Sequence, residues 1–156
     1  MAAILVLGIA AVAYAPYHTG GPPPGAPGGP GEPPGAGAQG GNNLKQQLST
    51  ATTHAGFAAE GASLAYVQQH LGHTVNCLEG TRGKNFNQAW GHVCEGQGNG
   101  ILADLRTATG GATFMAVAGA AGELALGGVK SKDLNEAKIA AKGTAALLKV
   151  IGDNLK

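Results

Sequence analysis

Apolar and polar residues recur with a helical period over most of this chain. Between residues 43 and 156 there is no proline, and apolar positions are spaced by three and four residues instead of alternating with polar ones. This pattern predicts an all-α fold. We expect three helices in this region, packed as a three-helix bundle in which the first helix is unusually long.

The first predicted helix begins at a cap on Asn42 or Asn43 and ends near Leu78. Its length of roughly 35 residues corresponds to about 50 Å. The helix carries two apolar stripes on roughly opposite sides. One stripe consists of Leu44, Leu48, Ala51, Ala55, Ala62 and Tyr66, and the other of Phe57, Leu64, Leu71, Val75 and Leu78. One side can pack on the other helices, so the second side requires a separate partner.

The second predicted helix follows a loop over Glu79–Asn99 that is rich in glycine and asparagine. We expect this helix over Gly100–Leu126, with a kink or interruption at Gly110-Gly111 and an end at Gly127-Gly128.

The third predicted helix begins at a cap on Ser131 and reaches about Leu155. Asp133 and Glu136 suit the positive end of the helix dipole in its first turns. The apolar stripe of this helix has the spacing of a bundle seam and consists of Leu134, Ala137, Ala141, Ala145, Leu148, Ile151 and Leu155.

The first 42 residues have a different composition. Met1–Ala15 is an uninterrupted apolar run, and Pro16–Asn42 contains all eight prolines. Three hypotheses remain open for the apolar run: a secretory signal, a membrane anchor, or a processed N-terminus in the core of an assembly. The Pro/Gly arm is predicted to be extended, either as a flexible linker or as an arm that crosses neighbouring subunits.

The apolar N-terminus resembles that of type IV pilins, in which an N-terminal helix becomes the filament core. Leu5 stands where those pilins typically carry a glutamate. By this logic of assembly, subunit contacts are expected in the apolar run, in the arm and on the second stripe of the first helix. The predicted contact residues are Ile4, Leu5, Leu7, Ile9, Pro22, Pro23, Pro24, Phe57, Leu64 and Leu71.

The composition narrows the functional classes. The net charge is +1 and the lysines and arginines are scattered, so the chain lacks the basic stripe of a nucleic-acid-binding protein. Charged residues make up only 12% of the chain, which suits close packing of helices or subunits. No nucleophile with a neighbouring base, paired carboxylates or cofactor fingerprint is visible, so we do not expect an enzyme.

The two cysteines, Cys77 and Cys94, are predicted to form a disulfide. Together with an apolar N-terminus they indicate export to an oxidising compartment. The bond would close a loop of about 18 residues and stabilise the fold by roughly 3 kcal/mol in the chain-entropy view. Two buried thiols, or a thiolate that binds a metal, are the alternatives.

Three histidines near these cysteines form a candidate metal site. His70, His73 and Cys77 are spaced i, i+3 and i+7 and therefore share one helix face. A disulfide from Cys77 to Cys94 would draw His92 towards His70 and His73. Three imidazoles with an open position are a common arrangement for Zn, and imidazole also suits Cu and Ni.

A structural role for these histidines is the alternative, because histidines near a helix C-terminus often cap carbonyl groups or cover a disulfide. A free thiol would instead give a mixed histidine and cysteine site. His54 would lie about 24 Å along the same helix from His70, which excludes it from this site within one chain.

One segment carries a resemblance to known sequences. HLGHTVNCLEG at His70–Gly80, followed by CEGQGNGI at Cys94–Ile101, resembles the pattern H-L-x-H-x-x-N-C-L-x-G…C…G-x-G-I of uncharacterised exported bacterial helical proteins. The resemblance implies export and a disulfide, and it carries no function. Met1–Asn42 lies outside it.

These features favour a structural subunit of an extracellular, bacterial, homopolymeric filament at the cell surface. Its main partner would be other copies of itself, with membrane contact through the N-terminus as an option. The alternative is a membrane-tethered periplasmic helical bundle that binds Cu or Zn at His70, His73 and His92.

Overall fold

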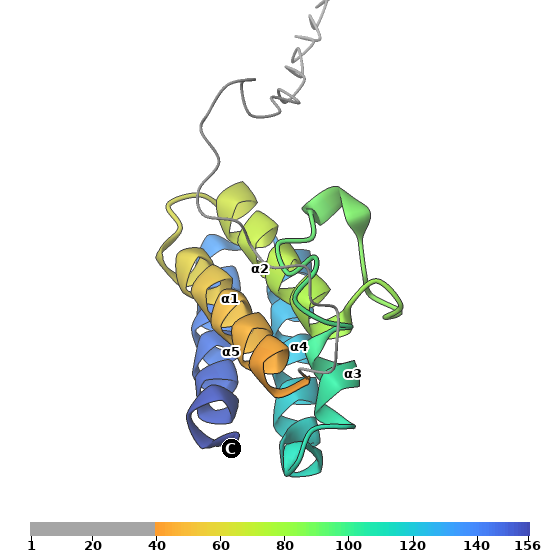
Figure 1. The fold of residues 1–156 in the computed structure, drawn as a ribbon. Helices are drawn as coiled ribbons and strands as arrows, with labels where there is room; N and C mark the ends of the chain where they lie inside the picture. The colour runs from red at the N-terminus through yellow and green to blue at the C-terminus, as the bar shows by residue number, and fades with distance from the viewer. Residues whose placement is uncertain (1–39) are drawn as a thin grey trace, which may run out of the picture. The chain divides into compact units, whose positions relative to one another are not determined.

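The computed structural model describes residues 40–156, and the predicted all-α class is confirmed there, since this range contains helices and no strand. Four helices form the body of the domain (Figure 1). They are α1 (Gly40–Glu60), α2 (Leu64–Glu79), α4 (Met115–Lys130) and α5 (Leu134–Asn154). The short helices are α3 (Ile101–Leu105) and two 3₁₀ turns, Gln88–Trp90 and Gly111–Phe114.

The four long helices form an antiparallel bundle. α1 packs against α2 and α5, and α4 packs against the same two helices, so each helix has two neighbours in the ring. The predicted bundle therefore has four main helices in place of three.

The single long helix predicted to end near Leu78 is wrong, because the chain reverses at residues 61–63. Ser63 leaves the helical region at φ −134° and ψ 150°, and its hydroxyl accepts a hydrogen bond from the Tyr66 N–H at 3.3 Å. A Cβ at Gly61 would lie 2.8 Å from side-chain atoms of both Tyr66 and Val67, so the turn requires glycine at this position. The two predicted stripes consequently belong largely to two helices that face one core.

The later helix boundaries also differ from the predicted ones. The second predicted helix is divided into α3, the turn at Gly111–Phe114 and α4, with the interruption at Gly110-Gly111 that the sequence indicates. α4 continues through Gly127-Gly128 to Lys130. Ser131 ends α4 instead of beginning α5, and Asp133 is the cap of α5, because its carboxylate accepts from the Glu136 N–H at 2.9 Å.

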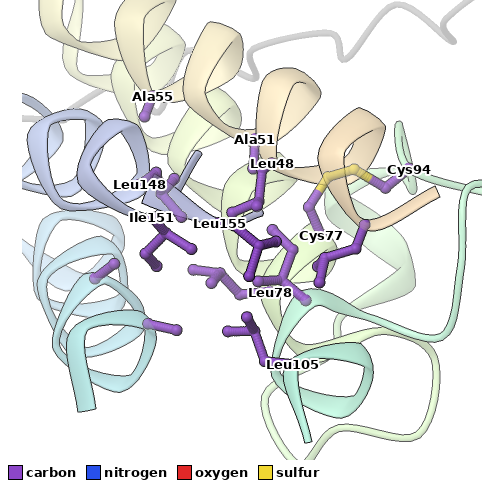
Figure 2. Packing of buried hydrophobic residues seen from close by; sticks show 14 residues of the cluster. Leu48, Ala51, Ala55, Cys77, Leu78, Cys94, Leu105, Leu148, Ile151 and Leu155 are labelled. Atoms are coloured by element: carbon purple, nitrogen blue, oxygen red, sulfur yellow. A yellow bond between two sulfur atoms is a disulfide. The ribbon is translucent and has the colours of Figure 1, made fainter. Parts of the chain in front are cut away.

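The core follows the apolar stripes (Figure 2). Of the first predicted stripe, Leu44, Leu48, Ala51 and Ala55 in α1 are buried, whereas Ala62 in the break and Tyr66 after it are exposed. The α5 stripe is confirmed, with Leu134 and Ala145 partly buried and the rest buried. Leu44 and Leu155 belong to one cluster, which brings the two ends of the described chain to the same end of the bundle.

The two hairpins, α1–α2 and α4–α5, correspond at an offset of 70 residues, from Thr74 to Thr144. Both hairpins have a three-residue connection, and both threonines are buried. Several buried positions of α1 recur in α4, and several of α2 recur in α5. The corresponding buried pairs are Ala51/Ala121, Ala55/Ala125, Val67/Ala137, Leu71/Ala141 and Leu78/Leu148. The two hairpins therefore correspond in the position of their turns and in several buried positions.

Within the described residues, one helical stretch, Gly111–Lys130, is long and apolar enough to cross a membrane by length and composition. In the bundle its buried positions are the small residues that α2 and α5 cover, among them Ala121 and Ala125. The predicted apolar run Met1–Ala15 and nearly all of the Pro/Gly arm, with the assembly contacts Ile4, Leu5, Leu7, Ile9, Pro22, Pro23 and Pro24, lie outside the described residues.

Candidate metal centre

Three histidines converge where α1 and α2 face each other. His54 comes from α1, and His70 and His73 lie one turn apart on α2. The Nδ1 atom of His54 is 3.0 Å from Nδ1 of His70 and 3.1 Å from Nδ1 of His73. One ligand atom from each ring lies within 4.8 Å of the other two, and all three side chains are partly buried.

The separation of these nitrogens is close to that of a bound metal site. Two imidazole nitrogens on a tetrahedral zinc ion lie about 3.3 Å apart, because each Zn–N bond is about 2.0–2.1 Å long. The observed separations of 3.0 and 3.1 Å are a few tenths of an ångström shorter. Small outward movements of the rings would thus admit an ion, with a fourth position left for water or another ligand.

Hydrogen bonding alone does not satisfy this arrangement well. The Gln69 amide nitrogen donates to the Trp90 carbonyl at 2.7 Å and lies 3.0 Å from His73 Nε2. His73 Nε2 is therefore an acceptor, and the proton of this neutral ring is on Nδ1, facing His54. His54 Nδ1 holds either one proton or one in-plane lone pair, and it contacts both His70 Nδ1 and His73 Nδ1. One proton or one lone pair on His54 Nδ1 cannot serve both neighbours well, whereas a cation accepts a lone pair from each of the three nitrogens.

The fold does not need histidines at these positions. In the second hairpin, Leu124, Ala140 and Gly143 stand where the first has His54, His70 and His73. There Leu124 packs against the backbone position of Gly143, with 3.0 Å between its Cδ1 atom and an ideal Cβ on that glycine. An apolar contact thus closes one hairpin at the point where three imidazoles meet in the other.

The protein environment disfavours the charged form of all three rings. Burial, followed by the charges of His73 and His70, lowers the pKa of His54 from 6.5 to about 4. Burial also lowers the pKa of His70. The pKa of His73 is lowered by burial and by His70, against a raising effect of the Trp90 carbonyl. At pH 7 the three rings are therefore neutral, which is the form that binds a metal.

Aromatic side chains surround the cluster. The Phe57 ring lies 5.6 Å from His54 and 5.4 Å from His70, and the Tyr66 ring lies 4.3 Å from His70, between ring centroids. Phe57 and Tyr66 are each nearly half exposed and also line an open pocket of about 330 Å³ at the α1–α2 turn. The site is accordingly hydrophobic on one side and close to solvent.

The loop after α2 covers the other side of the site. Asn76, fully buried in α2, donates to the Asn87 and Gly91 carbonyls at 2.8 and 2.6 Å and accepts from the Asn87 N–H at 2.9 Å. Gly72 lets Trp90 approach the helix, since a Cβ there would lie 2.5 Å from the indole ring. Gly91, at φ +85°, then passes next to His73. The residues 87–91 are thereby fixed against the histidine face of α2.

The predicted pairing of Cys77 with Cys94 is present in the structure, with the two Cα atoms 5.3 Å apart. Both cysteines are buried in the larger core cluster, and no free cysteine remains in the described range. The disulfide joins the end of α2 to the far end of the covering loop, so the alternative of a thiolate metal ligand does not apply to this form of the protein.

The predicted histidine site is partly corrected. His70 and His73 come together as expected, but the disulfide does not bring His92 to them; its ring packs instead against Phe86, with centroids 5.2 Å apart. His54 takes the third place. Its exclusion was wrong, because the break at residues 61–63 folds α1 back onto α2. The sequence signal that could have found His54 is the presence of two apolar stripes on opposite sides of the first predicted helix, since the two helices of a hairpin would account for both.

The predicted assembly residues of the first two helices have different surroundings. Leu71 is fully buried, so its assignment to a contact between subunits is wrong. Leu64 is partly buried in the smaller core cluster, and Phe57 is exposed beside the histidines. The filament itself stays a prediction, since its main contacts fall before residue 40.

Comparison with protein-family models, with curated proteins and with solved structures finds no match to this chain. The resemblance of the His70–Ile101 segment to exported bacterial helical proteins therefore also stays a prediction, and the function has to be argued from the site.

Proposed function

We propose that the bundle binds one transition-metal ion, of Cu, Zn or Ni, through His54, His70 and His73. The observation that carries this proposal is the meeting of three imidazoles at one point, where His54 Nδ1 lies 3.0 Å from His70 Nδ1 and 3.1 Å from His73 Nδ1. Imidazole nitrogen is a suitable ligand for each of these metals.

Two further observations support a functional role in preference to a structural one. The second hairpin closes with Leu124, Ala140 and Gly143, so the fold does not require imidazoles. The lowered pKa values keep the rings neutral at pH 7, so binding would displace few protons from them. The role we assign is metal binding, as in a carrier or buffer, without a reaction at the metal.

The disulfide supports an oxidising location for this metal-binding bundle. Such bonds persist in exported proteins and are rare in reducing compartments. We therefore keep the periplasm or the cell surface as the proposed location, with the N-terminal residues as the proposed tether.

The test is metal stoichiometry in matched variants. Wild type, dialysed against Zn²⁺ or Cu²⁺ at pH 7.5, should retain one ion per chain by elemental analysis. The variant His54→Leu/His70→Ala/His73→Gly carries the residues of the second hairpin and should fold but retain none. His92→Ala is the control and should bind like wild type. Full retention by the triple variant, or no binding by wild type, would overturn the proposal.

A further inference from the structure

We infer that Gln69 opposes metal binding because it holds His73 in the tautomer with the proton on Nδ1. When the ion binds, the Trp90 carbonyl loses its hydrogen bond from Gln69 and accepts one from His73 Nε2 instead. This inference rests on the proposed metal centre. It makes Gln69 a positioning residue that couples the ion to the covering loop.

The first step is a conflict between donors. A metal bound at His73 Nδ1 requires the proton of the neutral ring to move to Nε2. Nε2 lies 3.0 Å from the Gln69 amide nitrogen, which is itself a donor. Rotating the amide to present its oxygen to Nε2–H would place that oxygen against the Trp90 carbonyl oxygen, now 2.7 Å from the amide nitrogen. Gln69 therefore cannot keep both contacts once the ion is bound.

The second step is that a replacement acceptor is already present. The Trp90 carbonyl oxygen and His73 Nε2 contact the same amide nitrogen of Gln69, at 2.7 and 3.0 Å, so the two atoms are neighbours. The neighbouring Gly91 lies against Nε2, with 3.4 Å between Nε2 and an ideal Cβ on that residue. A backbone carbonyl that accepts from the second ring nitrogen is a standard outer-sphere partner of a metal-bound histidine. Trp90 is thus suited to orient His73 in the metal-bound form.

The third step is that residues 87–91 can adjust without losing their attachment. Asn76 holds Asn87 and Gly91 from within the helix through three hydrogen bonds that do not involve Gln69. Gln69 itself is exposed, so its amide can turn to solvent when displaced. The exchange consequently costs the loop one surface hydrogen bond and leaves its anchoring in place.

Two measurable consequences follow from this exchange. Removing the amide of Gln69 should strengthen metal binding, because the ion no longer displaces it. Outer-sphere partners change metal affinity by roughly 10- to 100-fold, so we expect a gain of about tenfold. Trp90 is the only tryptophan in the chain, so its fluorescence should respond to the ion in wild type.

The experiment titrates the oxidised full-length protein with Zn²⁺ at pH 7.5 in competition with a chelator. Gln69→Leu and Gln69→Glu remove the donor, and each should bind Zn²⁺ about tenfold more tightly than wild type. Gln68→Leu is the matched control, because Gln68 donates instead to the Val129 and Ser131 carbonyls at the other hairpin. Its Zn²⁺ affinity should equal that of wild type.

A second measurement needs no variant. Imidazole ¹⁵N shifts should show the His73 proton on Nδ1 without metal and on Nε2 with Zn²⁺, with a change in Trp90 fluorescence over the same titration. Equal or weaker binding by both Gln69 variants, or His73 protonated at Nε2 in the metal-free protein, would overturn the role of Gln69. If wild type takes up no Zn²⁺, the metal centre itself is overturned.

Discussion

Thr74 and Thr144 make the same pair of contacts in the two hairpins. Each hydroxyl donates to the carbonyl four residues earlier, at 3.0 Å for Thr74 and 2.9 Å for Thr144, and lies 3.4 Å from the carbonyl of an alanine on the facing helix. Both residues are fully buried. Each hairpin thus includes a buried polar contact between its two helices at the corresponding position.

The first prediction uses this pair. Thr74→Val and Thr144→Val should each lower the free energy of unfolding by about 1 kcal/mol, because each keeps the side-chain shape but removes a buried hydroxyl bonded to backbone. Urea unfolding followed by circular dichroism measures the effect. A loss of less than 0.3 kcal/mol in one variant and about 2 kcal/mol in the other would contradict the equivalence of the hairpins.

The second prediction concerns the contact of Trp90 with α2. Gly72→Ala should destabilise the protein by about 1–3 kcal/mol, because the new Cβ meets the indole ring and the helix cannot yield. The Trp90 emission maximum should move to longer wavelength as the ring becomes more exposed. Gly56→Ala is the control: no atom lies within 4 Å of its Cβ position, and relief of helix entropy should stabilise it by about 0.5–1 kcal/mol. Equal effects of the two substitutions would argue against this packing.

The third prediction concerns the disulfide, which spans 17 residues from Cys77 to Cys94. Replacing both cysteines with alanine should lower the free energy of unfolding by about 3 kcal/mol, because the unfolded chain regains the freedom of the closed loop. Zn²⁺ affinity should fall only modestly, since Asn76 still anchors residues 87–91. Complete loss of Zn²⁺ binding in a folded double variant would show that the disulfide, and not Asn76, positions the loop.

The fourth prediction is a pH dependence of stability from His54, whose pKa is lowered from 6.5 to about 4. Between these values the unfolded chain binds more protons than the folded one, so stability is fully present above pH 6.5 and falls as the pH drops towards 4. His70 and His73, with lowered pKa values, add to this effect in the same direction. Thermal melts from pH 7 to pH 4 measure it.

The control for the pH dependence is His54→Leu, which should flatten the decline in Tm over this range. It carries the residue of the second hairpin, so its fold should be retained. A stability that stays constant in wild type, or an equally steep decline in the variant, would mean that His54 is charged in the folded protein or does not govern this transition.

Helix class and core positions could be predicted from the sequence because they depend on a local period. The α5 stripe from Ala137 to Ile151 is buried as its spacing indicates, and Cys77 and Cys94 are paired as their context suggests. These features require no knowledge of where the chain turns.

The break at residues 61–63 could not be read in the same way. No proline marks it, and Gly61, Ala62 and Ser63 also occur inside helices, so the apolar period runs on through the turn. The sign of the break was the presence of two apolar stripes on opposite sides of the predicted helix. In a hairpin, each of the two helices can turn one stripe towards the core. A continuous helix would place His54 far from His70. The turn instead brings the Nδ1 atoms of the two residues to within 3.0 Å.

The cluster of His54, His70 and His73 lies entirely within one hairpin. Its histidines are only 16 and 19 residues apart in sequence, whereas the packing of α1 on α5 joins opposite ends of the described chain. Contacts over short loops form early in folding and long-range ones late. The three histidines are therefore expected to meet before α1 packs on α5, so that the candidate site is complete while the rest of the bundle is still folding.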